Sequence, residues 1–149
     1  MPPRIPAEPR NLIYVAAKRT MSPQAGAYGL LIVRTDGIAV SLSGSAAISS
    51  KRLLLLGIRE AGETLKGQAA IVISSDSNLV RVGKDLPEHR QTNFRSLEND
   101  DLWREIDALM GACSLTFRRL GTARRDRHYF DRARALAATQ LTKTPLENA

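Results

Sequence analysis

The chain has 149 residues, 43% of them hydrophobic and 25% charged, which fits one globular domain that can bury a sizeable core. Its 22 Lys and Arg residues exceed its 15 Asp and Glu residues, and the net charge of +7 favours a polyanionic partner; a well-solvated basic surface is the alternative explanation. The single cysteine, Cys113, excludes an intrachain disulfide, and no apolar run approaches the roughly 18 residues of a membrane-spanning helix, so we expect a cytoplasmic protein without a membrane partner.

Aliphatic runs, turn signals and helical periodicity divide the chain into nine expected elements. Asp36-Gly37 is a hairpin signal, so the second and third strands should pair antiparallel. Ser49 or Ser50 can begin a leucine-rich helix that Gly67 ends. In order we expect strands at 11–19, 28–33 and 38–43, a helix from 49 to 67, a strand at 69–75, a short helix at 78–83, a polar connection over 85–98, a helix from 99 or 100 to Gly111, a strand at 113–118 and a helix at 127–138.

This order predicts an α/β fold with a mixed five-stranded sheet, in which three antiparallel strands are followed by parallel strands, flanked by helices. The short aliphatic strand at 69–75 should lie parallel beside the first strand, covered on both faces. It ends at Asp76, whose charge needs compensation in so apolar a setting. Residues 1–10 hold four prolines and predict a flexible arm, residues 11–138 form the domain, and residues 139–149 predict a flexible tail.

Five segments of the chain carry a family resemblance. They are Gly26-Ala-Tyr-Gly-Leu-Leu-Ile32, Arg52, Ser75-Asp-Ser-Asn-Leu-Val80, Asp101-Leu-Trp-Arg-Glu-Ile-Asp-Ala-Leu109 and Asp131-Arg-Ala-Arg-Ala-Leu-Ala137. In this order, over about residues 11 to 138, they resemble type 1 ribonuclease H and the wider ribonuclease H-like superfamily. Type 1 enzymes hydrolyse the RNA strand of RNA–DNA hybrids with two divalent metal ions, about 4 Å apart, held by four carboxylates.

The resemblance implies that two of these four carboxylates are missing here. Asp76 matches the acid after the fourth strand, and Asp131 matches the acid of the last helix. Ala16 stands where the first strand should carry its acid, and Leu54 stands where the first helix should carry one. Neither alanine nor leucine can coordinate a metal ion. We therefore expect no metal and no cofactor, with at most one weak site between Asp76 and Asp131, and Mg²⁺ only if activity remains.

Lys18 offers a different cation for this site. It lies two residues after Ala16, so strand alternation puts both side chains on one face. We expect its ammonium to neutralise Asp76 or Asp131 in place of the metal; the alternative is that Lys18 points into solvent.

Basic residues favour nucleic acid as the partner. Seven arginines lie within the seventeen residues from 118 to 134, and a guanidinium binds phosphate with two parallel hydrogen bonds. Arg132 and Arg134 can instead form solvated ion pairs with Asp126 and Asp131. Ser50 and Lys51 replace the paired asparagines that the family uses to read the sugar, so we expect Lys51 to contact the nucleic-acid backbone. The expected binding residues are Lys18, Ser50, Lys51, Arg52, Asn78, Arg118, Arg119, Arg124, Arg125 and Arg127.

The sequence thus predicts a catalytically degenerate ribonuclease H-like protein that binds RNA, DNA or an RNA–DNA hybrid without hydrolysing it. Two alternatives stay open. The first is a protein-interaction module, such as a subunit of a nucleoprotein complex or a homodimer, with Phe94, Leu97 and residues 1–10 as docking elements. The second is an active metal-dependent ribonuclease H with a non-standard site.

Overall fold

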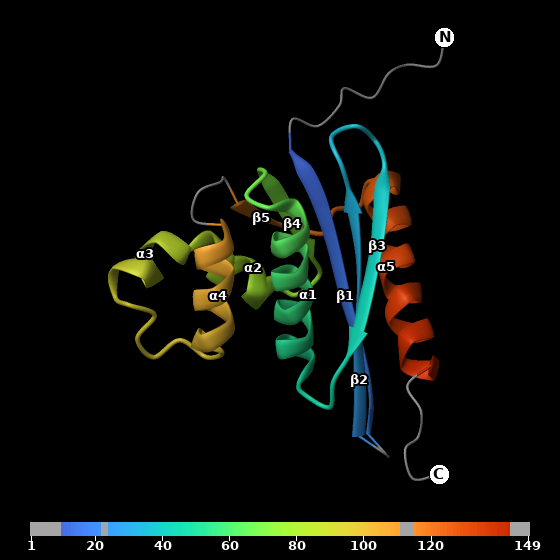
Figure 1. Cartoon of the computed structure of the whole chain (residues 1–149), viewed down its shortest axis with the longest axis horizontal. Coiled ribbons are helices and arrows are strands. Elements are labelled where there is room, and N and C mark those ends of the chain that lie inside the picture. Colours follow the sequence, from blue (N-terminus) through green and yellow to red (C-terminus); the bar gives the residue numbers. More distant parts are fainter. Residues whose placement is uncertain (1–9, 22–23, 111–114, 144–149) are drawn as a thin grey trace.

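A computed structural model of the chain describes residues 10–21, 24–110 and 115–143 (Figure 1). Residues 1–9 of the expected proline-rich arm, Gly111 and Cys113 lie outside these described ranges. All nine expected elements are present, with one helix added. The elements are β1 (Asn11–Met21), β2 (Gln24–Val33), β3 (Ala39–Ser45), α1 (Ser50–Leu65), β4 (Ala70–Ser74), α2 (Ser77–Lys84), α3 (Leu86–Gln91), α4 (Asp100–Met110), β5 (Leu115–Arg119) and α5 (Arg124–Lys143).

The added helix, α3, corrects the prediction of a polar connection over residues 85–98. It has six residues and one buried side chain, Leu86, so it is too short to show an apolar period in the sequence. Pro87 sits in its first turn, where a missing N–H costs no hydrogen bond.

The five strands form one mixed sheet in the order β3-β2-β1-β4-β5. β1 pairs antiparallel with β2, and β2 pairs antiparallel with β3. β4 lies parallel to both β1 and β5, with Tyr14 opposite Ile73. The predicted sheet is confirmed, and the start of β4 is reached through α1, which leaves the end of β3.

The β2–β3 turn and the two ends of α1 lie where the sequence predicted them. Gly37 adopts a φ of +88° in the β2–β3 hairpin, a conformation that glycine allows without strain. The hydroxyl of Ser49 accepts a hydrogen bond from the backbone N–H of Arg52 at 3.2 Å and caps α1. The helix ends at Leu65, where Lys66 takes the left-handed conformation just before Gly67.

Two layers of helices cover the sheet. Along β1, Ile13 and Val15 belong to the core beneath α1, α2 and α4, whereas Tyr14 and Ala16 belong to the core beneath α5. Figure 1 shows α1 and α4 on one side of the sheet and α5 on the other. Residues one apart on β1 therefore face different layers, which decides what each side chain can reach.

Helix α5 lies very close to β2 and is longer than predicted. A Cβ built on Gly29 would lie 2.2 Å from the carbonyl oxygen of Ala133, so the approach requires glycine. The helix starts at Arg124 rather than residue 127 and continues to Lys143, so the expected tail from residue 139 is wrong up to that point. The added turns are polar and lack the apolar period by which helices are recognised.

Phe94 and Leu97 do not form the exposed docking elements of the protein-interaction alternative. Phe94 is only 6% exposed, and the guanidinium of Arg104 lies 5.2 Å from its ring centre. Leu97 is half-buried against the same core. Across the described residues, no helix combines the length and hydrophobicity needed to span a membrane.

Candidate functional site

The two positions that the resemblance assigns to metal-binding acids are buried and apolar. Ala16 is 4% exposed and belongs to the core that contains Phe130 and Ala133 of α5. Leu54 is 8% exposed and belongs to the core on the other face of the sheet. Both side chains fill space in a packed interior, and neither offers an oxygen atom to a cation.

Asp76 lies between β4 and α2, where its carboxylate caps the helix. Its Oδ1 accepts a hydrogen bond from the backbone N–H of Leu79 at 3.0 Å. The ammonium of Lys51, on the first turn of α1, lies 3.0 Å from each of its carboxylate oxygens. Burial raises the pKa of Asp76, but these hydrogen bonds and the charge of Lys51 outweigh burial and lower that pKa overall.

Lys51, rather than Lys18, therefore neutralises Asp76. The same ammonium donates a hydrogen bond to Oδ1 of Asn78 at 3.0 Å, in addition to the one it donates to Oδ1 of Asp76. This corrects one prediction, because the cation at Asp76 is not Lys18. The Lys51 side chain is 26% exposed and paired with Asp76, and its contact with a nucleic-acid backbone stays a prediction.

Asp131 lies in a different setting from Asp76. Its side chain is 70% exposed on α5, and its Oδ1 lies 3.8 Å from Nη1 of Arg134, the ion pair considered for this helix. Asp131, Arg134 and Lys18 line a hollow of about 350 Å³ whose remaining wall is made of alanines. Lys18 thus shares a hollow with Asp131, and its predicted charge compensation there stays a prediction.

These residues do not fit a two-metal site. A pair of divalent ions beside a phosphate needs several converging carboxylates. No group of three or more His, Cys, Asp or Glu residues able to hold a metal exists in the described part of the chain. One acid of the expected pair is bound by Lys51 and the other is exposed beside Arg134.

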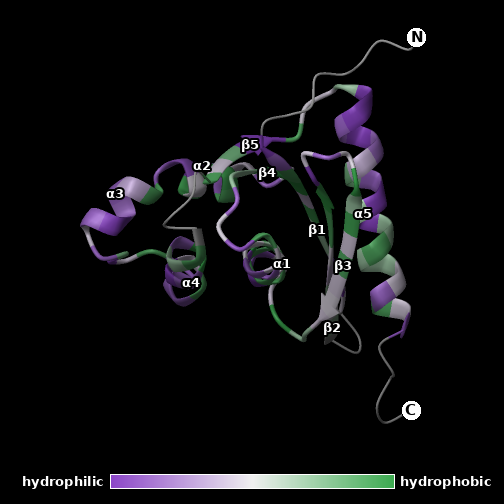
Figure 2. Cartoon of the chain, turned by 45° about the horizontal axis from the view of Figure 1, so that its top comes forward, coloured by the Kyte–Doolittle hydropathy of each residue, from purple (hydrophilic) through white to green (hydrophobic). Residues whose placement is uncertain are grey.

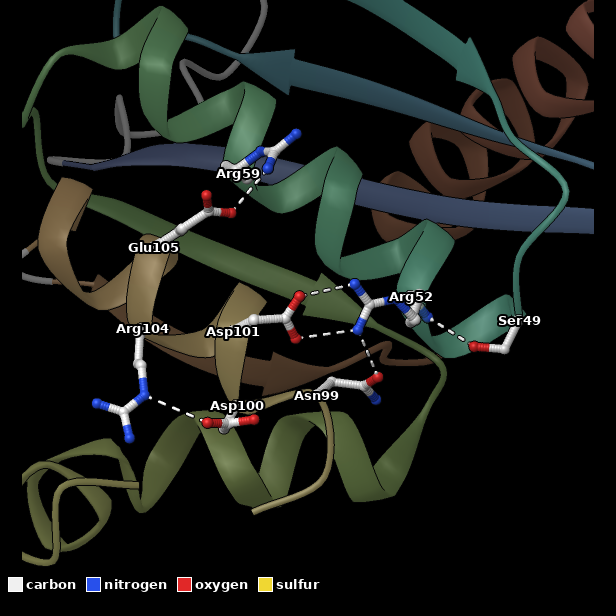
Figure 3. Close-up of polar contacts among 8 residues, drawn as sticks. All are labelled: Ser49, Arg52, Arg59, Asn99, Asp100, Asp101, Arg104 and Glu105. Carbon is white, nitrogen blue, oxygen red and sulfur yellow. Dashed lines mark hydrogen bonds and ion pairs between the residues drawn. The ribbon is translucent and has the colours of Figure 1, made fainter. Parts of the chain in front are cut away.

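Arg52, which was expected to contact nucleic acid, joins two helices of the protein. Its guanidinium forms two parallel hydrogen bonds with the carboxylate of Asp101, at 3.0 and 2.8 Å, and a third with Asn99 at 3.1 Å (Figure 3). The hydrogen bonds from Arg52 lower the pKa of Asp101 to about 2. The pair ties the start of α1 to the start of α4.

Arg118 is likewise engaged, in a buried network that the sequence did not reveal. Its guanidinium binds the carboxylate of Asp126 at 2.6 and 3.2 Å. The same carboxylate accepts hydrogen bonds from the Tyr14 hydroxyl at 2.7 Å and from the Gly121 backbone N–H at 3.2 Å. Asp126 has a 4% exposed side chain and joins β1, β5 and α5 through these contacts. Burial and the hydrogen bond to Asp126 raise the pKa of the Tyr14 hydroxyl.

The titration of Asp126 predicts a loss of stability in acid. Burial raises its pKa, but hydrogen bonds from Arg118, Tyr14 and Gly121 outweigh burial and lower the pKa from 3.8 to about 2. The folded state binds a proton at Asp126 less tightly than the unfolded state does. The ionised carboxylate therefore stabilises the folded state fully above about pH 4, and this stabilisation is lost as the pH falls towards 2. The expected loss is about 2 kcal/mol.

Urea unfolding of wild type and Asp126→Asn at pH 5, 3 and 2 measures this contribution. The asparagine variant lacks the titrating group, so the gap in unfolding free energy between the two proteins should narrow as the pH falls. An unchanged gap from pH 5 to 2 would contradict the expected titration.

Most of the remaining predicted binding residues are exposed at the surface. Arg119 at the end of β5 is exposed, as are Arg124 and Arg127, which lie three residues apart at the start of α5. We call these three residues the arginine segment. Figure 2 shows hydrophilic colour over much of α5. Lys18, Ser50 and Asn78 are exposed too, while Arg125 is half-buried.

Comparison with known proteins gives relatives of one kind. No protein-family model matches the chain. It is similar to ribonuclease HI of Neisseria meningitidis serogroup B, with 29% identity over 97 residues covering 60% of this chain and 67% of the relative. It is also similar to ribonuclease H of Chlorobium luteolum, with 27% identity over 142 residues covering 89% of this chain and 96% of the relative.

Solved structures share the fold at lower sequence identity. LC9-RNase H1, a type 1 RNase H with the type 2 active-site motif, matches with a TM-score of 0.74 and 18% identity, covering 96% of this chain and 76% of that one. A foamy viral protease-reverse transcriptase in complex with dsDNA matches with a TM-score of 0.76 and 15% identity over 95% of this chain and 98% of that one. A longer chain of the prototype foamy virus protein also matches, and this chain spans 22% of its length. Sequence and fold together place the chain in the ribonuclease H-like superfamily, with similarity to type 1 ribonucleases H.

Proposed function

We propose that this chain is a catalytically degenerate ribonuclease H-like protein, which binds RNA, DNA or an RNA–DNA hybrid without hydrolysing it. The observation that carries the proposal is the pair of buried apolar side chains, Ala16 and Leu54, at positions the resemblance assigns to metal-holding acids. We also propose that this function needs no metal cofactor and that the protein is cytoplasmic.

The case against hydrolysis concerns how charge is balanced at the site. Two-metal hydrolysis needs enough negative charge to hold two cations beside an anionic phosphate. Here Asp76, the less exposed of the two acids that match the family's site, is already neutralised by Lys51. A fold carries no activity by itself, so the loss of site residues outweighs the family likeness.

The case for binding concerns surface charge. The arginine segment places three exposed guanidiniums at one end of the sheet, on β5 and the start of α5. Such groups contact phosphates and release condensed counterions, which makes affinity salt-dependent. The complex of the foamy viral structure with dsDNA supports nucleic acid as the ligand class for this fold.

Fluorescence anisotropy tests this proposal with four labelled probes: single-stranded RNA, single-stranded DNA, duplex DNA and an RNA–DNA hybrid. We expect binding in EDTA to at least one probe, with affinity that falls steeply as salt rises. No binding to any probe at low salt would contradict the proposal. Stable co-purification with one protein would then favour the protein-interaction alternative.

An active nuclease with a non-standard site is the second candidate. The sequence relatives are named ribonuclease H, and LC9-RNase H1 is described as a type 1 enzyme with the type 2 active-site motif. Active-site motifs therefore vary within the type 1 group. This candidate requires metal-dependent cleavage of a hybrid by wild type and its loss in Asp76→Asn.

A further inference from the structure

The ammonium of Lys51 lies close to three side-chain oxygen atoms of the kind that also bind metal cations. Both carboxylate oxygens of Asp76 and the amide oxygen of Asn78 lie 3.0 Å from its nitrogen. Oδ1 of Asp76 and Oδ1 of Asn78 accept hydrogen bonds from the ammonium, and Oδ2 of Asp76 completes the ion pair. Carboxylate and amide oxygens are also the ligands that Mg²⁺ and Ca²⁺ take in proteins.

The starts of two helices bring Lys51 and Asp76 together. Lys51 lies in the first turn of α1, and Asp76 caps α2. Neither helix has an acid in its first turn, so Asp76 has no neighbouring acid there with which to hold a second cation. The side chains of Lys51 and Asp76 are 26% and 28% exposed, which shields their attraction from solvent more than at an open surface.

We infer that Lys51 is a resident cation, which occupies the place of a divalent metal ion at Asp76 and closes this site to Mg²⁺ and Mn²⁺. A metal ion must displace an ammonium that is tethered to the same molecule, and tethering gives that ammonium a high effective concentration. The displaced Lys51 would also remain beside the metal as a like charge. The consequence for ligand binding, which rests on the proposed function, is that nucleic-acid binding does not require a divalent metal.

Paramagnetic broadening by Mn²⁺ tests the inference on the ¹⁵N-labelled full chain without nucleic acid. In wild type, the amide cross-peaks of Ser75, Ser77 and Asn78 should persist when Mn²⁺ is added. In Lys51→Met, the oxygens of Asp76 and Asn78 lose their cation, and the same cross-peaks should disappear. In the double variant Lys51→Met/Asp76→Asn they should persist again.

Lys84→Met is the matched control, because it removes an exposed lysine at the end of α2, outside the Asp76 contact. Its cross-peaks at Ser75, Ser77 and Asn78 should behave as in wild type. Lys51→Gln provides a second, polar replacement should the methionine variant fold poorly. Loss of these cross-peaks in wild type, or their persistence in both Lys51 variants, would overturn the inference.

A binding measurement separates this inference from the proposed function. Wild type should bind the best anisotropy probe in EDTA at least as tightly as in Mg²⁺ at matched ionic strength, because Mg²⁺ only competes for the phosphates. A Mg²⁺ requirement would overturn metal-independent binding, whereas an absence of binding to every probe would overturn the proposed function and leave the Mn²⁺ result to decide the role of Lys51.

Discussion

Replacing Arg119, Arg124 and Arg127 together by alanine should weaken nucleic-acid binding on the order of 100-fold at physiological salt. Each lost phosphate contact lowers the slope of log affinity against log salt by about 0.9 for duplex DNA, so three contacts remove about 2.7. The fold should persist, because these side chains are exposed and two of them place positive charge at the unfavourable end of α5. Anisotropy at several salt concentrations measures both changes.

The matched control replaces three other exposed cations, Lys66, Lys84 and Arg95, by alanine. Both triple variants lose the same charge, but the control changes residues that do not belong to β5 or α5. Its affinity should fall much less, since only the long-range attraction of net charge is reduced. Equal losses in the two triple variants would show that the arginine segment is not the binding surface.

Asp126→Ala should lower the free energy of unfolding by about 3–5 kcal/mol. The alanine leaves the Arg118 guanidinium without its carboxylate and the buried Tyr14 hydroxyl without its acceptor. It also frees the Gly121 N–H, which holds the loop before α5. An unpaired buried polar group costs more than the hydrogen bond itself contributed.

Urea unfolding at pH 7 measures this effect, with Asp131→Ala as the control. Asp131 is the same residue type on the same helix, but its side chain is 70% exposed, so its replacement should change stability within about 0.5 kcal/mol. Similar losses in both variants would show that the buried network does not hold β1, β5 and α5 together.

The sheet could be predicted because its strands are aliphatic and its turns carry strong signals. Asp36-Gly37 specified the β2–β3 hairpin, and the run Ile71 to Ile73 specified a covered parallel strand. The errors fall where no apolar period exists. Helix α3 buries only Leu86, and the last turns of α5 are polar, so tertiary contacts rather than patterning determine both.

The position of Lys51 could have been found from topology. Helix α1 runs back to the start of β4, so its first turn lies at the opposite end of that strand, where Asp76 follows. Residue 51 is thus a better candidate partner for Asp76 than residue 18. Strand alternation showed which face Lys18 takes, but it did not show which acid lies near it.

The role of Asp126 could not have been read from the sequence. An acid in the first turn of a helix next to several arginines ordinarily indicates a solvated cap or a weak surface ion pair. Its burial depends on Tyr14, which is 112 residues away in the chain. Only the packing of α5 over β1 brings the two side chains together.

A cleavage assay on wild type decides between a binding protein and a nuclease. The chain is incubated with an RNA–DNA hybrid in Mg²⁺ or Mn²⁺, and binding is followed in the same samples. We expect the hybrid to be bound and its RNA strand to remain full length with either metal. Metal-dependent cutting of that strand, abolished by Asp76→Asn, would contradict the loss of the metal site.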